Sequence, residues 1–312
     1  MSSHALVDPE LLPLLEQMPT RSFGTEQIPV LREMSDDRFA FLDAPPLAPR
    51  QVTIAGPGGP LDIFVYDPQP RRDGRGALLH VHGGGMIMGS ARTMQHGPSA
   101  VAAATGTLVA SVEYRLAPEH PFPAPQEDCL AALEWLAGMG DELGFNAAKL
   151  GVMGESAGGG LAAATALMAR DRGGPALAAQ FLTYPMLDYR TGSAECRHNN
   201  PVTGEFIWTR EANQVGWSAL RGDYQPGDHR KGWFSPALAD TLEGLPKTWL
   251  GTGSLDLFLD ENLDFARRLI AASVPVELHS YPGAIHAFNA VPGAALTKSY
   301  ARDLLGAIAR WL

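Results

Sequence analysis

Short apolar runs and longer helical patterns alternate along the chain from about residue 50 to its end. The expected strands are RQVTIAG (50–56), LDIFVYD (61–67), GALLHVH (76–82), TLVASVEY (107–114), KLGVMGE (149–155), AAQFLTYP (178–185), KTWLGTG (247–253) and VPVELHSYP (274–282). The expected helices are QEDCLAALEWLAGM (126–139), LAAATALMARD (161–171), ENLDFARRLIAA (261–272) and TKSYARDLLGAIARWL (297–312). Such alternation predicts βαβ units, and therefore an α/β fold with a mostly parallel sheet. The first two strands are joined by GPGGP, which favours an antiparallel hairpin.

Two segments interrupt this alternation. Residues 1–45 have a helical pattern broken by prolines, and residues 186–235 carry little strand signal but several aromatic side chains. The polar composition and aromatic side chains of the second segment suggest a small cap packed over the sheet edge.

Composition excludes several classes of function. The formal net charge is −10 and no basic stripe is visible, so nucleic acid is not expected as a partner. No apolar run approaches the roughly 20 residues of a membrane helix. The N-terminus lacks the basic start of a signal peptide, so we expect a cytoplasmic protein. Cys129 and Cys196 are expected to be reduced thiols, and the nine histidines show no metal-ligand spacing, so no metal is expected. The oligomeric state stays open, a homodimer included.

The stretch GVMGESAGGG (151–160) places Ser156 between an expected strand and an expected helix. In a G-x-S-x-G elbow the serine occupies a sharp turn, and the flanking Gly154 and Gly158 are small because other backbone passes close to them. The hydroxyl then lies at the carboxyl edge of the sheet, beside a helix N-terminus that favours an oxyanion. The alternative is a seam of small residues where a helix packs on a sheet.

A second glycine-rich stretch, HVHGGGMIMG (80–89), also follows an expected strand. A structural loop rarely needs three consecutive glycines. The backbone N–H groups of Gly83, Gly84 and Gly85, together with that of Ala157, can converge on one point and form an oxyanion hole. A flexible or phosphate-binding loop is the alternative, but no P-loop lysine follows.

Several motifs together resemble those of the hormone-sensitive-lipase-like branch of the α/β-hydrolases, whose bacterial members are called family IV carboxylesterases. They are HGGG (82–85), YRLAPEHPFPAPQED (114–128), GESAGG (154–159), YP (184–185), WFSP (233–236), GTGSLDLFLDEN (251–262) and PGAIHAF (282–288). The resemblance implies a serine carboxylesterase with an eight-stranded, mostly parallel sheet and a helical cap. The chain then divides into an N-terminal part of the cap (1–45), the first part of a catalytic α/β core (46–185), a cap insert (186–235) and the second part of the core (236–312). Two departures are Glu155, where Asp is commoner, and Leu257, where Pro is usual.

The order of chemical groups along the chain agrees with that family. α/β-Hydrolases carry serine, acid and histidine in this order, and here Ser156 is followed by Asp256 and His286, each just after an expected strand. In this arrangement His286 takes the proton from Ser156 and Asp256 orients the imidazole. Asp260 instead precedes a helix, so we expect it to cap the first turn of that helix.

Other candidates have simpler interpretations. We expect His82 to shape the glycine loop by hydrogen bonding, and His80 and His279 to pack within strands. Arg115, Glu119 and Asp128 are expected to form a buried ion network, and Glu155 to brace or cap the serine turn. The flexible and aromatic side chains that flank the site predict an apolar substrate pocket: Met86, Met88, Leu187, Phe206, Trp208, Trp217 and Phe288.

The leading hypothesis for function is hydrolysis of a small-molecule ester with a short- to medium-chain acyl group, without cofactor. The same triad also serves amide or carbamate hydrolysis and acyl transfer to an alcohol, which the sequence does not separate. A non-catalytic ligand-binding receptor of the hydrolase fold is a remote alternative, because His286 is present.

Overall fold

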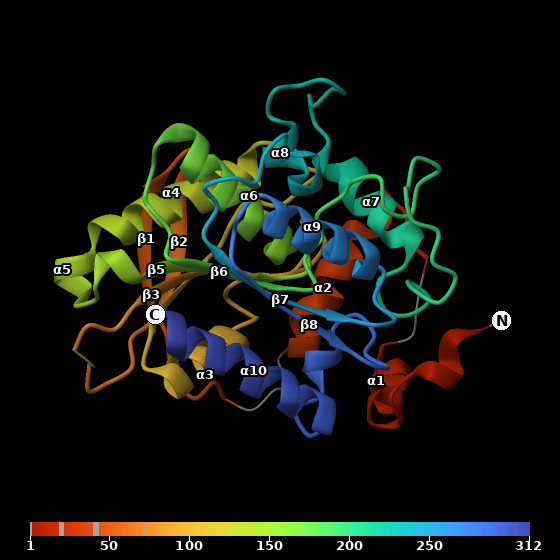
Figure 1. Ribbon diagram of the computed structural model, residues 1–312, viewed down its shortest axis with the longest axis horizontal. Helices are drawn as coiled ribbons and strands as arrows, with labels where there is room; N and C mark the ends of the chain where they lie inside the picture. Colours follow the sequence, from red (N-terminus) through yellow and green to blue (C-terminus); the bar gives the residue numbers. More distant parts are fainter. Residues whose placement is uncertain (1, 19–21, 40–43, 72) are drawn as a thin grey trace.

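The computed structural model describes residues 2–18, 22–39, 44–71 and 73–312. One eight-stranded sheet forms in the order β1-β2-β4-β3-β5-β6-β7-β8 (Figure 1). The strands are β1 (Arg50–Gly56), β2 (Gly59–Tyr66), β3 (Ala77–Val81), β4 (Leu108–Val112), β5 (Leu150–Glu155), β6 (Ala179–Thr183), β7 (Lys247–Gly253) and β8 (Val276–Tyr281). β2 pairs antiparallel with β1 and β4, and every pairing from β4 to β8 is parallel. The expected hairpin and the mostly parallel α/β sheet are confirmed.

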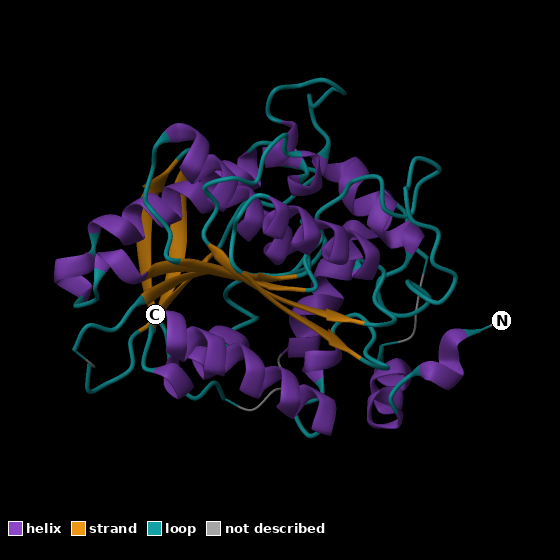
Figure 2. Cartoon of the chain, in the orientation of Figure 1, coloured by secondary structure: helices purple, strands orange, loops and turns teal. Residues whose placement is uncertain are grey.

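Helices cover both faces of this sheet (Figure 2). The core helices are α3 (His96–Thr105), α4 (Ala124–Gly138), α5 (Gly140–Leu143), α6 (Ala157–Arg172), α9 (Leu259–Ala271) and α10 (Ala295–Trp311). α3 and α10 lie on one face, and α4, α6 and α9 lie on the other (Figure 1). Coverage on both faces explains why every residue of β3, β4 and β6 is buried. The edge strands β1 and β8 are partly exposed.

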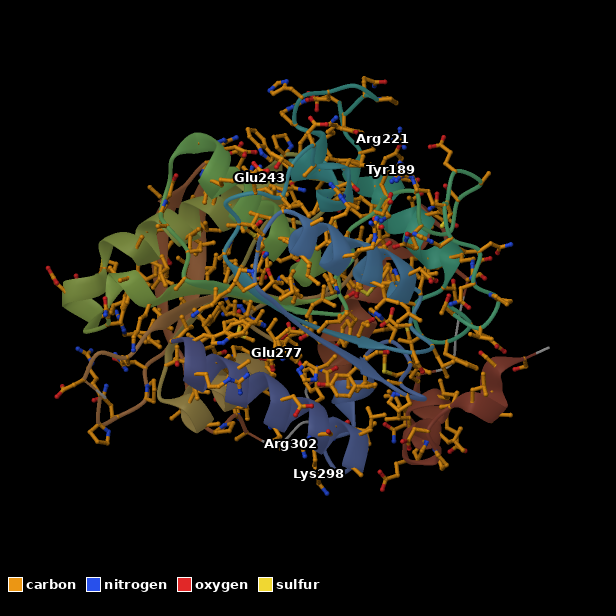
Figure 3. The ribbon with its side chains drawn as sticks, in the orientation of Figure 1. Tyr189, Arg221, Glu243, Glu277, Lys298 and Arg302 are labelled. Atoms are coloured by element: carbon orange, nitrogen blue, oxygen red, sulfur yellow. The ribbon has the colours of Figure 1, made fainter. Side chains whose placement is uncertain are left out.

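The two expected cap segments contain the remaining helices, which are α1 (Leu12–Gln17), α2 (Ile28–Phe39), α7 (Arg210–Leu220) and α8 (Lys231–Phe234). These segments contact each other: the carboxylate of Glu205 accepts hydrogen bonds from Ser2 Oγ, Ser3 N and Ser3 Oγ at 2.5–2.7 Å. The Arg221 guanidinium lies over the Tyr189 ring, 5.6 Å from its centroid. Both residues belong to the insert and are labelled near each other in Figure 3. The N-terminal segment and the insert therefore lie together.

No helix within the described ranges is long and apolar enough to cross a membrane.

Candidate active site

Ser156 occupies the turn between β5 and α6 with φ 56° and ψ −123°, a conformation that non-glycine residues rarely adopt. The turn is tight because backbone from other segments presses on it. A Cβ on Gly154 would lie 2.3 Å from the carbonyl oxygen of Gly158, and a Cβ on Gly158 would lie 2.1 Å from that of Val81. Glycine is therefore required at both positions, and the strained serine is held by its surroundings.

Two loops at the carboxyl ends of neighbouring parallel strands bring an imidazole and a carboxylate to this serine. His286 Nε2 lies 2.9 Å from Ser156 Oγ, and His286 Nδ1 lies 2.8 Å from Asp256 Oδ2. The second oxygen of Asp256 accepts a hydrogen bond from the backbone N–H of Phe258 at 2.9 Å. Asp256 is fully buried, and Ser156 and His286 are almost so. A hydroxyl, an imidazole and a carboxylate in this order can deliver an activated serine oxygen.

Three aromatic rings surround His286. The ring centroids of Tyr184, Phe258 and Trp208 lie 4.8, 5.4 and 6.5 Å from that of His286. Tyr184 has φ 35° and donates its hydroxyl proton to Asn289 Oδ1 at 2.5 Å, and burial raises the pKa of this phenol well above its usual value. Tyr184, Phe258 and Asn289 were not expected from the sequence as neighbours of the site, because their contacts join segments far apart in the chain.

The loop that contains Gly83, Gly84 and Gly85, the glycine loop, lies beside Ser156. A Cβ on Gly83 would lie 3.5 Å from Ser156 Cβ, and Gly84 and Gly85 have φ of 120° and 63°. Gly84 O accepts from the N–H groups of Ile87 and Met88, which folds the loop back on itself. Within the described part of the chain, no carbonyl accepts a backbone hydrogen bond from Gly83, Gly84 or Gly85. Ala157 is the first residue of α6, so its N–H has no acceptor within the helix.

His82 shapes this loop, as expected from the sequence. Its Nδ1 donates to the carbonyl oxygen of Gly83 at 2.8 Å, and its ring stacks on Tyr114 at 4.2 Å. Complete burial lowers the pKa of His82 to about 3, because a charged imidazole would have no water around it. His82 is therefore neutral at ordinary pH and holds the loop through a neutral hydrogen bond.

Three expectations about charged groups need correction. Arg115 pairs with buried Asp128 at 2.8 Å as expected, but Glu119 instead binds Arg32 of α2, whose guanidinium also donates to the carbonyls of Ile87 and Ala117. The expected three-membered network is wrong because the partner of Glu119 comes from the cap.

His80 also differs from the expectation. It does not merely pack within its strand: its ring contacts Glu155 Oε2 at 3.0 Å and Ser111 Oγ at 2.8 Å. The pairing fits the bracing role that the sequence suggested for Glu155, the residue just before the serine.

The third correction concerns Asp260. It lies inside the first turn of α9, and no side chain caps that helix at Phe258. The carboxylate that reaches the N–H of Phe258 belongs to Asp256. The expected cap at Asp260 is therefore wrong, because the helix begins one residue before it.

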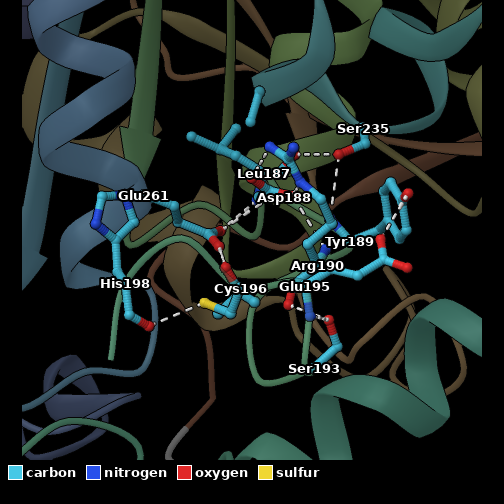
Figure 4. A network of polar contacts seen from close by, with 12 residues as sticks. Leu187, Asp188, Tyr189, Arg190, Ser193, Glu195, Cys196, His198, Ser235 and Glu261 are labelled. Atoms are coloured by element: carbon cyan, nitrogen blue, oxygen red, sulfur yellow. Dashed lines mark hydrogen bonds and ion pairs between the residues drawn. The ribbon is translucent and has the colours of Figure 1, made fainter. Parts of the chain in front are cut away.

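The next residue, Glu261, was not singled out from the sequence. It is buried and accepts hydrogen bonds from the N–H of Leu187 at 2.6 Å, from the N–H of Asp188 at 3.4 Å and from Thr191 Oγ1 (Figure 4). Burial, reinforced by the nearby Asp188, raises the pKa of Glu261 well above its usual value. Glu261 thus ties α9 to the start of the cap insert.

The expected pocket residues have different surroundings. Trp208 contacts the glycine loop at Gly85 and faces His286. The other aromatic residues have these neighbours: Phe206 lies against His4, Trp217 against Phe234, and Phe288 among Tyr184, Tyr281 and Tyr300. Met86 and Leu187 are buried, and Met88 is partly buried, in the core on the side of α4 and α6. The contacts with the serine site are thus clearest for Trp208, and the pocket stays a prediction.

Among the described residues, no group of three or more His, Cys, Asp or Glu side chains is arranged to hold a metal ion. The site is built from a serine, a histidine, a carboxylate and backbone N–H groups.

Comparison with known proteins assigns the chain to a family. A family model described as alpha/beta hydrolase fold matches residues 78–290, so the chain belongs to that family. The family expected from the sequence is confirmed.

Relatives with similar sequences and structures are esterases. Esterase LipI of Mycobacterium tuberculosis is 32% identical over 306 residues, which cover 96% of this chain and 93% of LipI. Carboxylesterase NlhH of the same species is 35% identical over 309 residues, covering 93% of this chain and 92% of NlhH. The solved structure of a bacterial heroin esterase has a TM-score of 0.90 at 35% identity, covering 100% of this chain and 99% of that one. A hyperthermophilic esterase from Pyrobaculum calidifontis has a TM-score of 0.86 at 31% identity, covering 97% and 98%.

Proposed function

We propose that this protein is a serine carboxylesterase that hydrolyses small-molecule esters with short- to medium-chain acyl groups. The observation that carries the proposal is the continuous contact from Ser156 Oγ through His286 to Asp256, at 2.9 and 2.8 Å. The esterase names of the relatives, LipI and NlhH among them, support it. So do the glycine loop and the first residue of α6, Ala157, whose backbone N–H groups lie next to the serine without a backbone acceptor in the described part of the chain.

In the first half of the reaction, Ser156 Oγ forms a bond to the ester carbonyl carbon while its proton passes to His286 Nε2. The carbonyl oxygen becomes an oxyanion that accepts hydrogen bonds from backbone N–H groups of the glycine loop (Gly83, Gly84, Gly85) and from Ala157. When the carbon–oxygen bond to the alcohol breaks, His286 gives the proton to the leaving oxygen. An acyl-serine and a free alcohol result.

In the second half, His286 takes a proton from water as the water oxygen attacks the acyl carbon. The bond to Ser156 Oγ then breaks, the proton returns to that oxygen, and the carboxylic acid leaves. Asp256 remains ionised throughout, keeps the Nδ1–H of His286 pointing at itself and stabilises the imidazolium. The atoms and protons of the two half-reactions balance without an oxidant, a reductant or a cofactor.

The organisation of the chain fits this reaction. Residues 46–185 and 236–312 supply the α/β core, and residues 1–45 and 186–235 supply the cap, which limits the room for the substrate. We assign to the substrate pocket the residues expected from the sequence, with Trp208 as its best-supported member. A cytoplasmic location is part of the same proposal and rests on the sequence alone.

Amide or carbamate hydrolysis and acyl transfer use the same groups, so substrate choice separates the candidates. The test is a set of initial rates on p-nitrophenyl esters from acetyl to palmitoyl, with p-nitroacetanilide as the amide and a rate measured in the presence of added alcohol. We expect the highest kcat/KM on short esters. Absence of activity on every ester, or faster hydrolysis of the anilide, would contradict the proposal.

A further inference from the structure

Trp208 of the cap insert is packed directly on the glycine loop. A Cβ on Gly85 would lie only 2.3 Å from Trp208 Cη2 and 2.7 Å from Cζ2, so the benzo edge of the indole touches the Gly85 backbone. The ring as a whole is farther from His286, with 6.5 Å between ring centroids. Trp208 therefore touches the loop whose N–H groups we assign to the ester carbonyl oxygen, and it lies at longer range from His286, the ring that protonates the leaving alcohol.

Two further residues meet at the same place. A Cβ on Gly216 of α7 would lie 2.9 Å from the carbonyl oxygen of Gly85, 3.5 Å from Trp208 Cζ2 and 3.6 Å from Met186 Cε. The backbone N–H of Met186 donates to the carbonyl oxygen of Ser156 at 2.9 Å. The indole, the α7 backbone and the Met186 thioether thus form an apolar wall that runs from the glycine loop to the serine turn.

For an ester attacked by Ser156, this wall would border the acyl side of the site. The leaving oxygen of the alcohol must lie within hydrogen-bonding distance of His286 Nε2, because it receives its proton there. The acyl chain extends from the carbonyl carbon away from that nitrogen, and its neighbours are then the glycine loop and the segment that follows β6. Trp208 bounds this space at Gly85.

The indole is fixed by a buried chain of hydrogen bonds. Trp208 Nε1 donates to Asn213 Oδ1 at 3.2 Å, and Asn213 Nδ2 donates to the carbonyl oxygen of Thr191 at 2.7 Å. The hydroxyl of Thr191 donates to Glu261, which also holds the backbone of Leu187 (Figure 4). Rotating the indole away would leave Oδ1 of the fully buried Asn213 without the donor Trp208 Nε1, which is costly. The wall is therefore rigid.

We propose that Trp208 sets the upper limit on acyl-chain length, and that Asn213, Thr191 and Glu261 hold it in that position. The proposal rests on the proposed function, because an acyl side exists only if Ser156 attacks an ester. It assigns to one side chain the preference for short acyl groups.

The test compares kcat/KM on p-nitrophenyl acetate, butyrate and octanoate for the native protein, Trp208→Phe, Trp208→Ala and Asn213→Leu. We expect Trp208→Ala to raise the octanoate-to-acetate ratio by about tenfold or more, the discrimination that apolar pockets reach for small changes in size. Trp208→Phe should raise it less. Asn213→Leu keeps the indole but removes its acceptor, so it should raise the ratio by a smaller factor than Trp208→Ala.

Trp233→Ala is the matched control, because Trp233 is a cap tryptophan that packs on Arg172 and donates to Asp171 on the outer side of α6. The octanoate-to-acetate ratio of kcat/KM in Trp233→Ala should equal that of the native protein. A second series, ethyl, benzyl and 2-naphthyl acetates, varies the alcohol and should keep its native order of rates in every variant.

An unchanged octanoate-to-acetate ratio in folded Trp208→Ala, or a changed order in the alcohol series instead, would overturn the proposal. If Trp208→Ala does not fold, the ratio in Trp208→Phe decides. A failure of the proposed function looks different, because the native protein itself would then be inactive on every acetate.

Discussion

Replacing Asp256 by asparagine tests the assignment of the acid through a change of one atom. Asp256 is fully buried, and its two oxygens have different donors: the N–H of Phe258 at 2.9 Å and Nδ1 of His286 at 2.8 Å. Asparagine can satisfy both neighbours in only one orientation. Its oxygen accepts from Phe258, and its NH₂ group donates to Nδ1 of His286.

That orientation reverses the imidazole tautomer. Nδ1 must present its lone pair, so the proton moves to Nε2 and points at Ser156 Oγ, and His286 cannot accept the serine proton. We expect kcat to fall about 10⁴-fold, the loss seen when a serine hydrolase triad is forced into the wrong tautomer. This corresponds to about 5 kcal/mol in the activation free energy. Because all hydrogen bonds find partners, the free energy of unfolding should change by only about 1 kcal/mol.

The assay is the steady-state rate on p-nitrophenyl acetate at pH 8, with urea unfolding of the same samples. Asp260→Asn is the matched control, since Asp260 lies four residues away in the first turn of α9, where a carboxylate interacts favourably with the helix dipole. It should keep native kcat and lose about 0.3–1 kcal/mol of stability. A kcat for Asp256→Asn within tenfold of the native value, or an equal loss in Asp260→Asn, would refute the reasoning.

Two further predictions concern the scaffold of the site. His82 has its pKa lowered to about 3 from 6.5, so below pH 6.5 the unfolded chain binds a proton that the folded protein excludes, and stability is lost as pH falls from 6.5 to about 3. At pH 5 this loss is about 2 kcal/mol. In urea titrations, His82→Gln should therefore reduce the difference in unfolding free energy between pH 7 and pH 5 by that amount. An unchanged difference would count against a buried neutral His82. Gly158→Ala should prevent folding or lower the melting temperature sharply, because its Cβ would lie 2.1 Å from the carbonyl oxygen of Val81. The control Gly97→Ala has open space around its Cβ and should stabilise α3 by up to about 1 kcal/mol. Similar melting temperatures for the two variants would contradict the close packing at the turn.

The sheet was predictable because each strand is a local apolar run, and burial on both faces makes such runs conspicuous. The candidate triad residues were predictable for a related reason. Ser156, Asp256 and His286 each follow a strand, and the carboxyl ends of parallel strands meet at one edge of the sheet. Local sequence therefore carries both the core and the positions of the reacting groups.

The missed features depend on contacts between distant segments. Helix α3 is HGPSAVAAAT, whose alanines give little amphipathic contrast, and it is held by packing against β4 and α10. Glu119 pairs with Arg32, which is 87 residues away in the sequence, and Glu261 accepts a hydrogen bond from Leu187, which is 74 residues away. No periodicity encodes such pairs. The wrong cap at Asp260 has a local cause, because the start of a helix is uncertain by a residue or two in any sequence pattern.

The central claim is that Ser156 forms the covalent intermediate, and labelling with a fluorophosphonate ester tests it most directly. The reagent should inactivate the native protein with one adduct per chain, and peptide mass spectrometry should locate that adduct on Ser156. The Ser156→Ala variant should fold, take up no label and lose almost all turnover. An adduct on another residue, or a labelled and active Ser156→Ala protein, would contradict the account.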